Sequence, residues 1–197
     1  MSVSRPLAPR LLLFALPVAM FVAACGASPA ASFDPSGPCA QDGSAPGAYP
    51  ELEALVPPVY EDTPPETLDS GRHCTAESLG TLRGAGIDEV RFAGGTWGFG
   101  GIRAAALAVF SAPGLTADAM ADFYAASART ANRTLVTAES EPTLAGRHVH
   151  RIDTETGPRQ QTVVVWPAEE ADVVNVVITN DLPDPKIEAA IEAFDEP

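Results

Sequence analysis

The longest uncharged apolar run of the chain lies near its start, and it limits which residues can join a folded domain. Arg5 and Arg10 precede the run, and residues 11–24 carry no charge. A helix that crosses a bilayer needs roughly 20 apolar residues, and this run is shorter and contains Pro17. Positive residues followed by a short apolar stretch and small residues are the layout of a secretory signal peptide. We therefore predict that residues 1–24 are a signal peptide and that the domain is built from later residues.

The end of this run, Val22-Ala23-Ala24-Cys25, resembles the lipobox of bacterial lipoproteins. The resemblance implies cleavage after Ala24 and a diacylglycerol thioether on Cys25. Two acyl chains, at about 0.8 kcal/mol per buried methylene, suffice for stable attachment. The expected location is thus the cell membrane, lipid-anchored and facing outside the cytoplasm, in an inner membrane, an outer membrane or a monoderm surface. The alternative is an ordinary secretory peptide with an unrelated cysteine.

The composition excludes one large class of partners. The chain has 26 acidic residues against 12 Lys and Arg, with a net charge of −14, and its arginines are scattered. Nucleic-acid affinity comes largely from neutralising phosphates, so we predict no nucleic-acid binding. Anionic lipid headgroups are disfavoured for the same reason, which leaves the lipid on Cys25 as the expected contact with the membrane. No pattern in the sequence indicates a cofactor.

Two cysteines remain if Cys25 is acylated, namely Cys39 and Cys74. In an oxidising compartment two remaining cysteines most simply form a disulfide. Two free thiols are the alternative.

The rest of the chain predicts a tether followed by one domain. Residues 25–50 are rich in Gly, Ala, Ser and Pro, which is typical of a flexible tether. Residues 51–197 alternate apolar periodicities with turn signals, and we expect a single α+β domain. The expected helices cover 51–56, 75–83, 116–131 and 184–194, and the expected strands cover 88–92, 104–111, 134–139, 147–154, 161–166 and 172–179.

Strands joined by short turns are mostly antiparallel, so we expect a mainly antiparallel sheet of about five to six strands covered by two or three helices. The uniformly apolar segment 104–111 predicts a strand that is covered on both faces. The element order is similar to the PsbP-type α/β/α sandwich, a resemblance of fold that implies no function.

Nearly the whole chain also resembles a group of uncharacterised bacterial lipoproteins. The features that carry this resemblance are the lipobox cysteine, the tether, Leu52-Glu53-Ala54-Leu55-Val56-Pro57, the strand 108–110 leading into residues 113–117, and Ala145-Gly146-Arg147 before a strand. The resemblance implies no catalytic residues.

Residues 94–101 contain five glycines, yet they match no phosphate-binding loop. Read from Gly98, the Gly-x-Gly-x-x-Gly pattern has Arg103 where its third glycine belongs, and there is no Walker sequence. We expect glycines at a hairpin bend, with Trp97 and Phe99 packing nearby.

His148 and His150 are the candidate metal ligands. On one strand, residues i and i+2 face the same side, so the two imidazoles can chelate one metal with His73 or a carboxylate completing the site. The alternative is a solvated sheet face on which polar residues alternate, beside Arg147 and Arg151.

The polar residue Asn175 lies among valines, so its amide must line a pocket or sit at an exposed edge. The sequence has no Gly-x-Ser-x-Gly elbow, and the predicted disulfide consumes the thiols that a cysteine nucleophile needs.

The sequence thus favours a membrane-anchored, extracytoplasmic and non-catalytic binding or interaction module, with another envelope protein or a small ligand as its partner. The alternatives are a metal-binding protein or enzyme centred on His148 and His150, and a purely structural envelope lipoprotein.

Replacing the acylated residue tests the anchor. We expect Cys25→Ser to move the protein from the membrane fraction to the soluble fraction, because no other predicted segment holds it to a bilayer. Fractionation followed by immunoblotting measures the shift. Unchanged membrane association of the Cys25→Ser protein contradicts the prediction.

Overall fold

The structure, a computed structural model, describes residues 33–195. The predicted signal peptide (1–24), its cleavage site at Ala24 and the lipidation site Cys25 lie outside the described residues. No helix within the described range is long and apolar enough to cross a membrane.

The domain is α+β and is organised around one large antiparallel sheet. Eight of the strands in the described residues form this sheet in the order β1-β2-β3-β4-β10-β9-β8-β5, and β6 and β7 form a separate two-stranded sheet. The strands are β1 (Gly43–Ala45), β2 (Thr67–His73), β3 (Val90–Gly98), β4 (Ala104–Ser111), β5 (Thr134–Ser140), β6 (Thr143–Leu144), β7 (Arg147–His148), β8 (His150–Thr156), β9 (Arg159–Pro167) and β10 (Val173–Asn180). The helices are α1 (Pro50–Glu53), α2 (Ala76–Leu79), α3 (Thr81–Gly84), α4 (Ala117–Thr130), α5 (Asp184–Glu192) and the 3-10 turn η1 (Ala193–Asp195).

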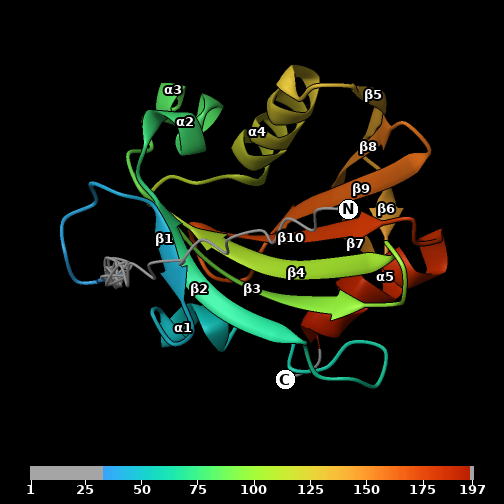
Figure 1. Cartoon of the computed structure of the whole chain (residues 1–197), viewed down its shortest axis with the longest axis horizontal. Coiled ribbons are helices and arrows are strands. Elements are labelled where there is room, and N and C mark those ends of the chain that lie inside the picture. Colours follow the sequence, from blue (N-terminus) through green and yellow to red (C-terminus); the bar gives the residue numbers. More distant parts are fainter. Residues whose placement is uncertain (1–32, 196–197) are drawn as a thin grey trace, which may run out of the picture. The chain divides into compact units, whose positions relative to one another are not determined.

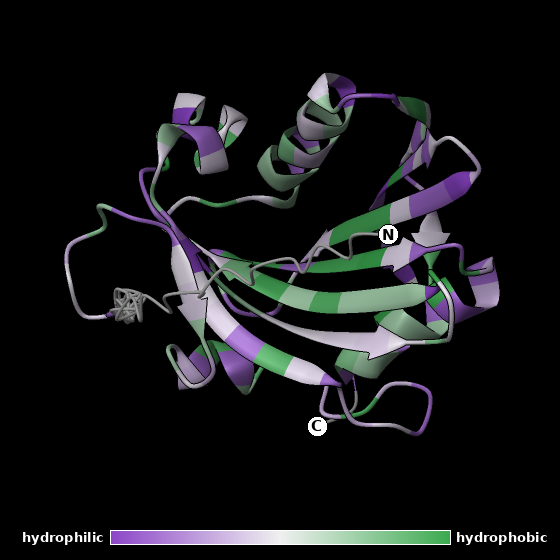
Figure 2. Cartoon of the chain, in the orientation of Figure 1, coloured by the Kyte–Doolittle hydropathy of each residue, from purple (hydrophilic) through white to green (hydrophobic). Residues whose placement is uncertain are grey.

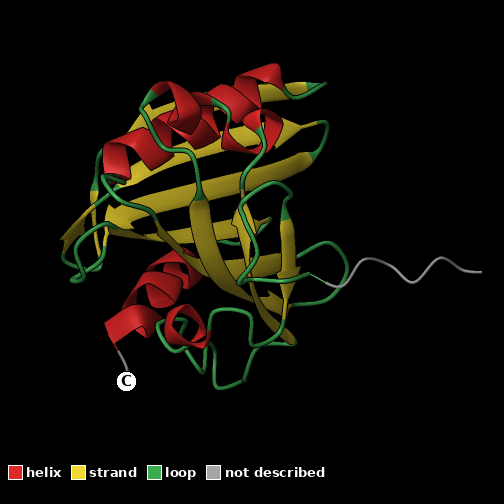
Figure 3. Cartoon of the chain, turned by 90° about the vertical axis from the view of Figure 1, so that its left-hand side faces the viewer, coloured by secondary structure: helices red, strands yellow, loops and turns green. Residues whose placement is uncertain are grey.

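Helices cover both faces of the sheet, with α2, α3 and α4 on one side and α1 and α5 on the other (Figure 1 and Figure 3). Each side has its own apolar cluster. On the α4 side, Met120 packs over Val163 and Val176, and on the α5 side, Ile187 and Ile191 pack over strand residues such as Leu107. The middle strands β4, β9 and β10 are the most continuously apolar part of the sheet (Figure 2). The prediction that residues 104–111 are covered on both faces is therefore confirmed.

The sheet has more strands than the five to six predicted. Neither β1, a strand of three residues, nor β2, which begins at Thr67, is among the strands that the sequence predicts. Both strands are polar and lie towards one edge of the sheet, so their sequences lack the apolar alternation that marks β4 or β10.

The predicted helix over 75–83 is two short turns, because Gly80 adopts a left-handed φ of 49° between them. The hairpin bend lies at the end of the glycine-rich residues 94–101 and not in their middle. Strand β3 continues to Gly98, and Gly100 and Gly101, both with positive φ, make the turn into β4. Trp97 is buried, as predicted.

Residues 33–50, which the sequence predicts as part of a flexible tether, lie within the compact unit of residues 33–197. The predicted disulfide between Cys39 and Cys74 is present, with the two Cα atoms 5.5 Å apart. In the loop-entropy account, closing a loop of this length stabilises the fold by about 4 kcal/mol. The bond holds residues 33–45, called the lead-in segment below, against the sheet beside β2.

A buried arginine holds the same segment. Arg72 on β2 is only 5% exposed, and its two terminal nitrogens donate to the backbone carbonyls of Asp34, Pro35, Gly37 and Pro38 at 2.8–3.3 Å. These four carbonyl dipoles replace the hydration that the buried cation loses. A low-complexity composition therefore does not prevent order here, since the disulfide and Arg72 supply contacts that the segment's own side chains lack.

Asp42 joins the lead-in segment to α2. Its carboxylate accepts hydrogen bonds from the backbone N–H groups of Cys74 (2.6 Å) and Thr75 (3.0 Å) and from the hydroxyls of Thr75 and Ser78. Partial burial raises the pKa of Asp42, but these hydrogen bonds outweigh it and lower the pKa to about 2.

This lowered pKa predicts a pH-dependent contribution to stability. The pKa of Asp42 is depressed from 3.8 in the folded chain, so its stabilisation is present above about pH 4 and lost as the pH falls towards about 2. We expect Asp42→Asn to destabilise the domain at pH 7 by about 1 kcal/mol, because the neutral amide loses the charge-assisted hydrogen bonds from Cys74, Thr75 and Ser78. Calorimetric Tm values should converge for the two proteins near pH 2.

Glu77→Gln is the matched control, because Glu77 is exposed on α2 and makes no side-chain hydrogen bond to another described residue. It should leave the Tm unchanged at both pH values. A deficit of Asp42→Asn that persists undiminished at pH 2 contradicts the assignment.

Candidate functional site

A cleft on the α5 side of the sheet combines apolar walls with a polar floor. Its volume is about 600 Å³, within the range of about 300–1,000 Å³ that is typical of small-molecule sites. One wall is the segment that follows α1, and the opposite wall is the end of α5 with η1. The apolar lining comprises Leu55, Val56, Pro57, Pro58, Pro65, Leu68, Ala168 and Phe194.

Asn175 lines this cleft from β10, near the middle of the sheet. Its neighbours across the sheet are Val109 on β4 and Trp166 on β9. The residue is 8% exposed, yet its amide makes no hydrogen bond to any described residue, and neither amide atom is sealed from the cleft. Of the two sequence-based interpretations of Asn175, a pocket lining and an exposed edge, the structure supports the pocket.

Such an amide is unusual in this core. The buried hydroxyl groups of the central strands have hydrogen-bond partners. Thr162 donates to Asp153 at 2.6 Å, and Thr179 donates to the Thr162 carbonyl at 3.5 Å. Buried polar groups nearly always have a partner, and one without a partner invites a functional explanation. Asn175 therefore has unused hydrogen-bonding capacity in the cleft, as does Arg147, whose buried Nε also lacks a partner among the described residues.

Aromatic packing shapes the wall beside Asn175. The rings of Trp166 and Phe194 meet edge to face, with centroids 5.2 Å apart. Trp166 is 1% exposed, and its indole N–H has no partner among the described residues. Phe194 follows α5, so the position of that helix sets the width of the cleft on this side.

The charged residues of the cleft are mostly carboxylates. Arg147 forms an ion pair with Asp195, while the Glu53 carboxylate accepts from the Ser70 hydroxyl at 2.8 Å and from the Gly47 N–H at 2.7 Å. Glu169 and Glu170 lie exposed in the turn between β9 and β10 and make no ion pair within the described residues. The single guanidinium is thus compensated, and the free charge at the rim is negative.

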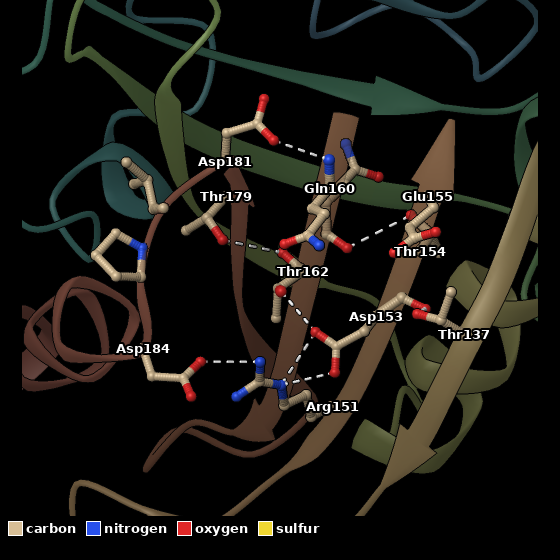
Figure 4. A pocket seen from close by; sticks show the side chains of 13 residues that line it. Thr137, Arg151, Asp153, Thr154, Glu155, Gln160, Thr162, Thr179, Asp181 and Asp184 are labelled. Carbon is tan, nitrogen blue, oxygen red and sulfur yellow. Dashed lines mark hydrogen bonds and ion pairs between the residues drawn. The ribbon is translucent and has the colours of Figure 1, made fainter. Parts of the chain in front are cut away.

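A second, smaller cavity of about 370 Å³ lies where β8, β9 and β10 approach the start of α5, and its lining is almost entirely polar (Figure 4). Arg151 lines this cavity between Asp153 and Asp184. Its Nε contacts both Asp153 oxygens at 2.9 and 3.1 Å, and its terminal nitrogen contacts Asp184 at 2.9 Å.

Burial lowers the pKa of Arg151, but its hydrogen bonds to Asp153 and Asp184 outweigh burial and raise the pKa above its usual value. Arg151 thereby ties β8 to the first residue of α5. The charge of Arg151 is already neutralised by Asp153 and Asp184, so the polar lining of this cavity is explained by its structural role.

The two histidines of the metal hypothesis do not lie on one strand. Val149, buried and bonded through its N–H to the Pro142 carbonyl, separates β7 from β8, so His148 belongs to the small sheet and His150 to the large one. Both imidazoles nevertheless approach the same carboxylate, since Glu141 lies 3.6 Å from a nitrogen of each. Asp118 on α4 is 2.9 Å from the other nitrogen of His150.

His73, the third ligand considered, is not part of this cluster and stacks on Phe92 with ring centroids 4.8 Å apart. Within residues 33–195 no group of three or more His, Cys, Asp or Glu side chains is arranged to hold a metal ion. Sequence reasoning could not identify Glu141 or Asp118 as neighbours of the histidines, because they come from a loop and from a distant helix.

Comparison with known proteins does not add to this geometry. No protein-family model matches the chain, and a search of curated proteins finds no similar sequence.

Replacing Asn175 by an apolar residue of similar size tests whether its amide is kept for function. We expect Asn175→Leu to raise the free energy of unfolding by about 1 kcal/mol, because it removes an unpartnered polar group from an apolar surrounding. Thermal unfolding followed by circular dichroism measures the change.

Thr179→Val is the matched control on the same strand. Its hydroxyl is partnered, so its loss should destabilise the domain slightly. A loss of stability in Asn175→Leu that equals or exceeds that of Thr179→Val contradicts this interpretation.

Proposed function

We propose that this protein is a lipid-anchored, extracytoplasmic and non-catalytic binding module that takes a small ligand in the Asn175 cleft. The observation that carries the proposal is the buried amide of Asn175, which has no hydrogen-bond partner among residues 33–195 and lines a cavity with apolar walls. Sites for small molecules are typically apolar clefts with a few polar groups that orient the ligand. The likeness to PsbP-type sandwiches concerns the fold and adds nothing to this function.

The proposed location agrees with the covalent chemistry of the domain. Disulfides persist outside the cytoplasm, and the Cys39–Cys74 bond closes the segment that follows the predicted lipidation site. In this proposal the acylated Cys25 keeps the domain at the membrane, and the cleft meets ligands near the membrane surface.

A neutral fluorescent probe tests the cleft. We expect N-phenyl-1-naphthylamine to bind the secreted Cys25→Ser form with increased fluorescence. This form keeps the whole domain and lacks the acyl chains that would themselves take up the probe. Ala168→Phe, which fills part of the cleft, should weaken binding by about tenfold or more, as expected when about 1.4 kcal/mol of binding energy is lost.

Ala128→Phe is the matched control, because Ala128 is also half-buried and lines a different surface hollow beside α4. It should leave the affinity for the probe unchanged. Absence of probe binding, or equal loss in both variants, overturns the proposed site.

Metal binding at His148 and His150 is the second candidate function, and the approach of Glu141 to both imidazoles favours it. Side-chain rotation would have to bring the three groups around one ion. Calorimetric titration with zinc should then show stoichiometric uptake that His148→Ala abolishes. A titration without binding heat eliminates this candidate.

A further inference from the structure

We propose that the Asn175 cleft selects small apolar molecules that carry a neutral carboxamide. This inference rests on the proposed ligand-binding role and specifies the chemistry of the ligand. It follows from three properties of the lining, namely the hydrogen-bonding capacity of the floor, the apolar walls and the sign of the free charge.

The floor offers one donor and one acceptor side by side. The amide of Asn175 has an N–H₂ group and a carbonyl oxygen, and both lack partners among the described residues. A carboxamide presents the complementary acceptor and donor, so it can form two hydrogen bonds with Asn175 at once. An ester satisfies only the donor, and an amine or a carboxylate each satisfies one side of the pair.

The walls set the character of the rest of the ligand. The segment after α1 contributes Leu55, Val56 and two prolines, and Phe194 faces them from the end of α5. These side chains offer no hydrogen-bonding groups. The apolar part of a ligand therefore gains binding free energy when it leaves water and packs against them, while the carboxamide of the ligand reaches Asn175.

The charge of the lining disfavours anions. Four carboxylates line the cleft against the single guanidinium of Arg147, which Asp195 already neutralises. An anionic head at Asn175 therefore lacks a free cation. A cationic head meets Glu53, which already accepts hydrogen bonds from Gly47 and Ser70, and the exposed Glu169 and Glu170, whose charges water and salt screen strongly. A neutral carboxamide is therefore the head group that loses the least hydration free energy on entering the cleft and forms the most hydrogen bonds with Asn175.

A series of ligands with one tail and different heads tests this selection. Octanamide, methyl octanoate, octylamine and octanoate compete with N-phenyl-1-naphthylamine for the Cys25→Ser form. We expect octanamide to displace the probe at the lowest concentration and octanoate at the highest. Asn175→Leu should raise the half-displacing concentration of octanamide about tenfold and that of octylamine, which loses one hydrogen bond and not two, by a smaller factor.

Thr179→Val, a neighbouring substitution on β10 outside the cleft, should keep the wild-type order of the four ligands. Asn175→Ala replaces Asn175→Leu if the latter does not fold. Displacement by N-acetyl-leucinamide as well as by octanamide supports the carboxamide class, and the stronger of the two shows whether a branched or a linear body fits the walls.

Stronger displacement by octanoate or octylamine than by octanamide overturns the inference, and so does an equal effect of Asn175→Leu on all four ligands. In both cases the probe still binds, so the cleft remains a ligand site. Failure of the probe to bind at all instead removes the proposed function.

Discussion

Strands β4 and β10 and residues 162–166 of β9 are largely buried on both faces, and most of the domain is arranged around that burial. Helix α4 with α2 and α3 supplies one cover, and α1 with α5 supplies the other. A strand covered twice has no solvent to satisfy its side chains, so its residues must be apolar or hydrogen-bonded within the protein. Val163 to Val165 and Val176 to Val177 meet the first condition, and Thr162 and Thr179 meet the second. Asn175 meets neither, because the cover above it is incomplete.

That gap exists because the α5 side is closed by two short pieces. Helix α1 is only four residues long and continues into prolines, while α5 ends in the turn that carries Phe194. The cleft lies between them and reaches down to β10. On the opposite face the 14-residue helix α4 lies along the sheet and buries Met120 and Ala125, and surface hollows flank it. The proposed site thus lies where the segment after α1 and the turn after α5 leave part of β10 uncovered.

The lead-in segment shows how little its own composition decides. Residues 33–45 are as rich in Gly, Ser and Pro as a linker, yet Arg72, Asp42 and the Cys39–Cys74 bond hold them in place. The contacts of Arg72 and Asp42 join residues more than 30 positions apart, and no local pattern in the sequence can reveal them, whereas the disulfide follows from the count of cysteines. The same limit applies to Glu141 and Asp118 beside the histidines, and to the walls of the cleft.

The sequence alone determined the α+β class, the antiparallel order of the later strands and the pairing of Cys39 with Cys74, because these depend on local periodicity, turn residues and a simple count of cysteines. Thr75 and Thr116 cap α2 and α4 at the predicted starts of these helices, since a cap is a contact within one turn. Only the tertiary structure decided that β1 and β2 extend the sheet, that the domain starts at Phe33, and that Asn175 faces a cleft. Those outcomes depend on which distant segments pack together, and packing between distant segments leaves no period in the chain.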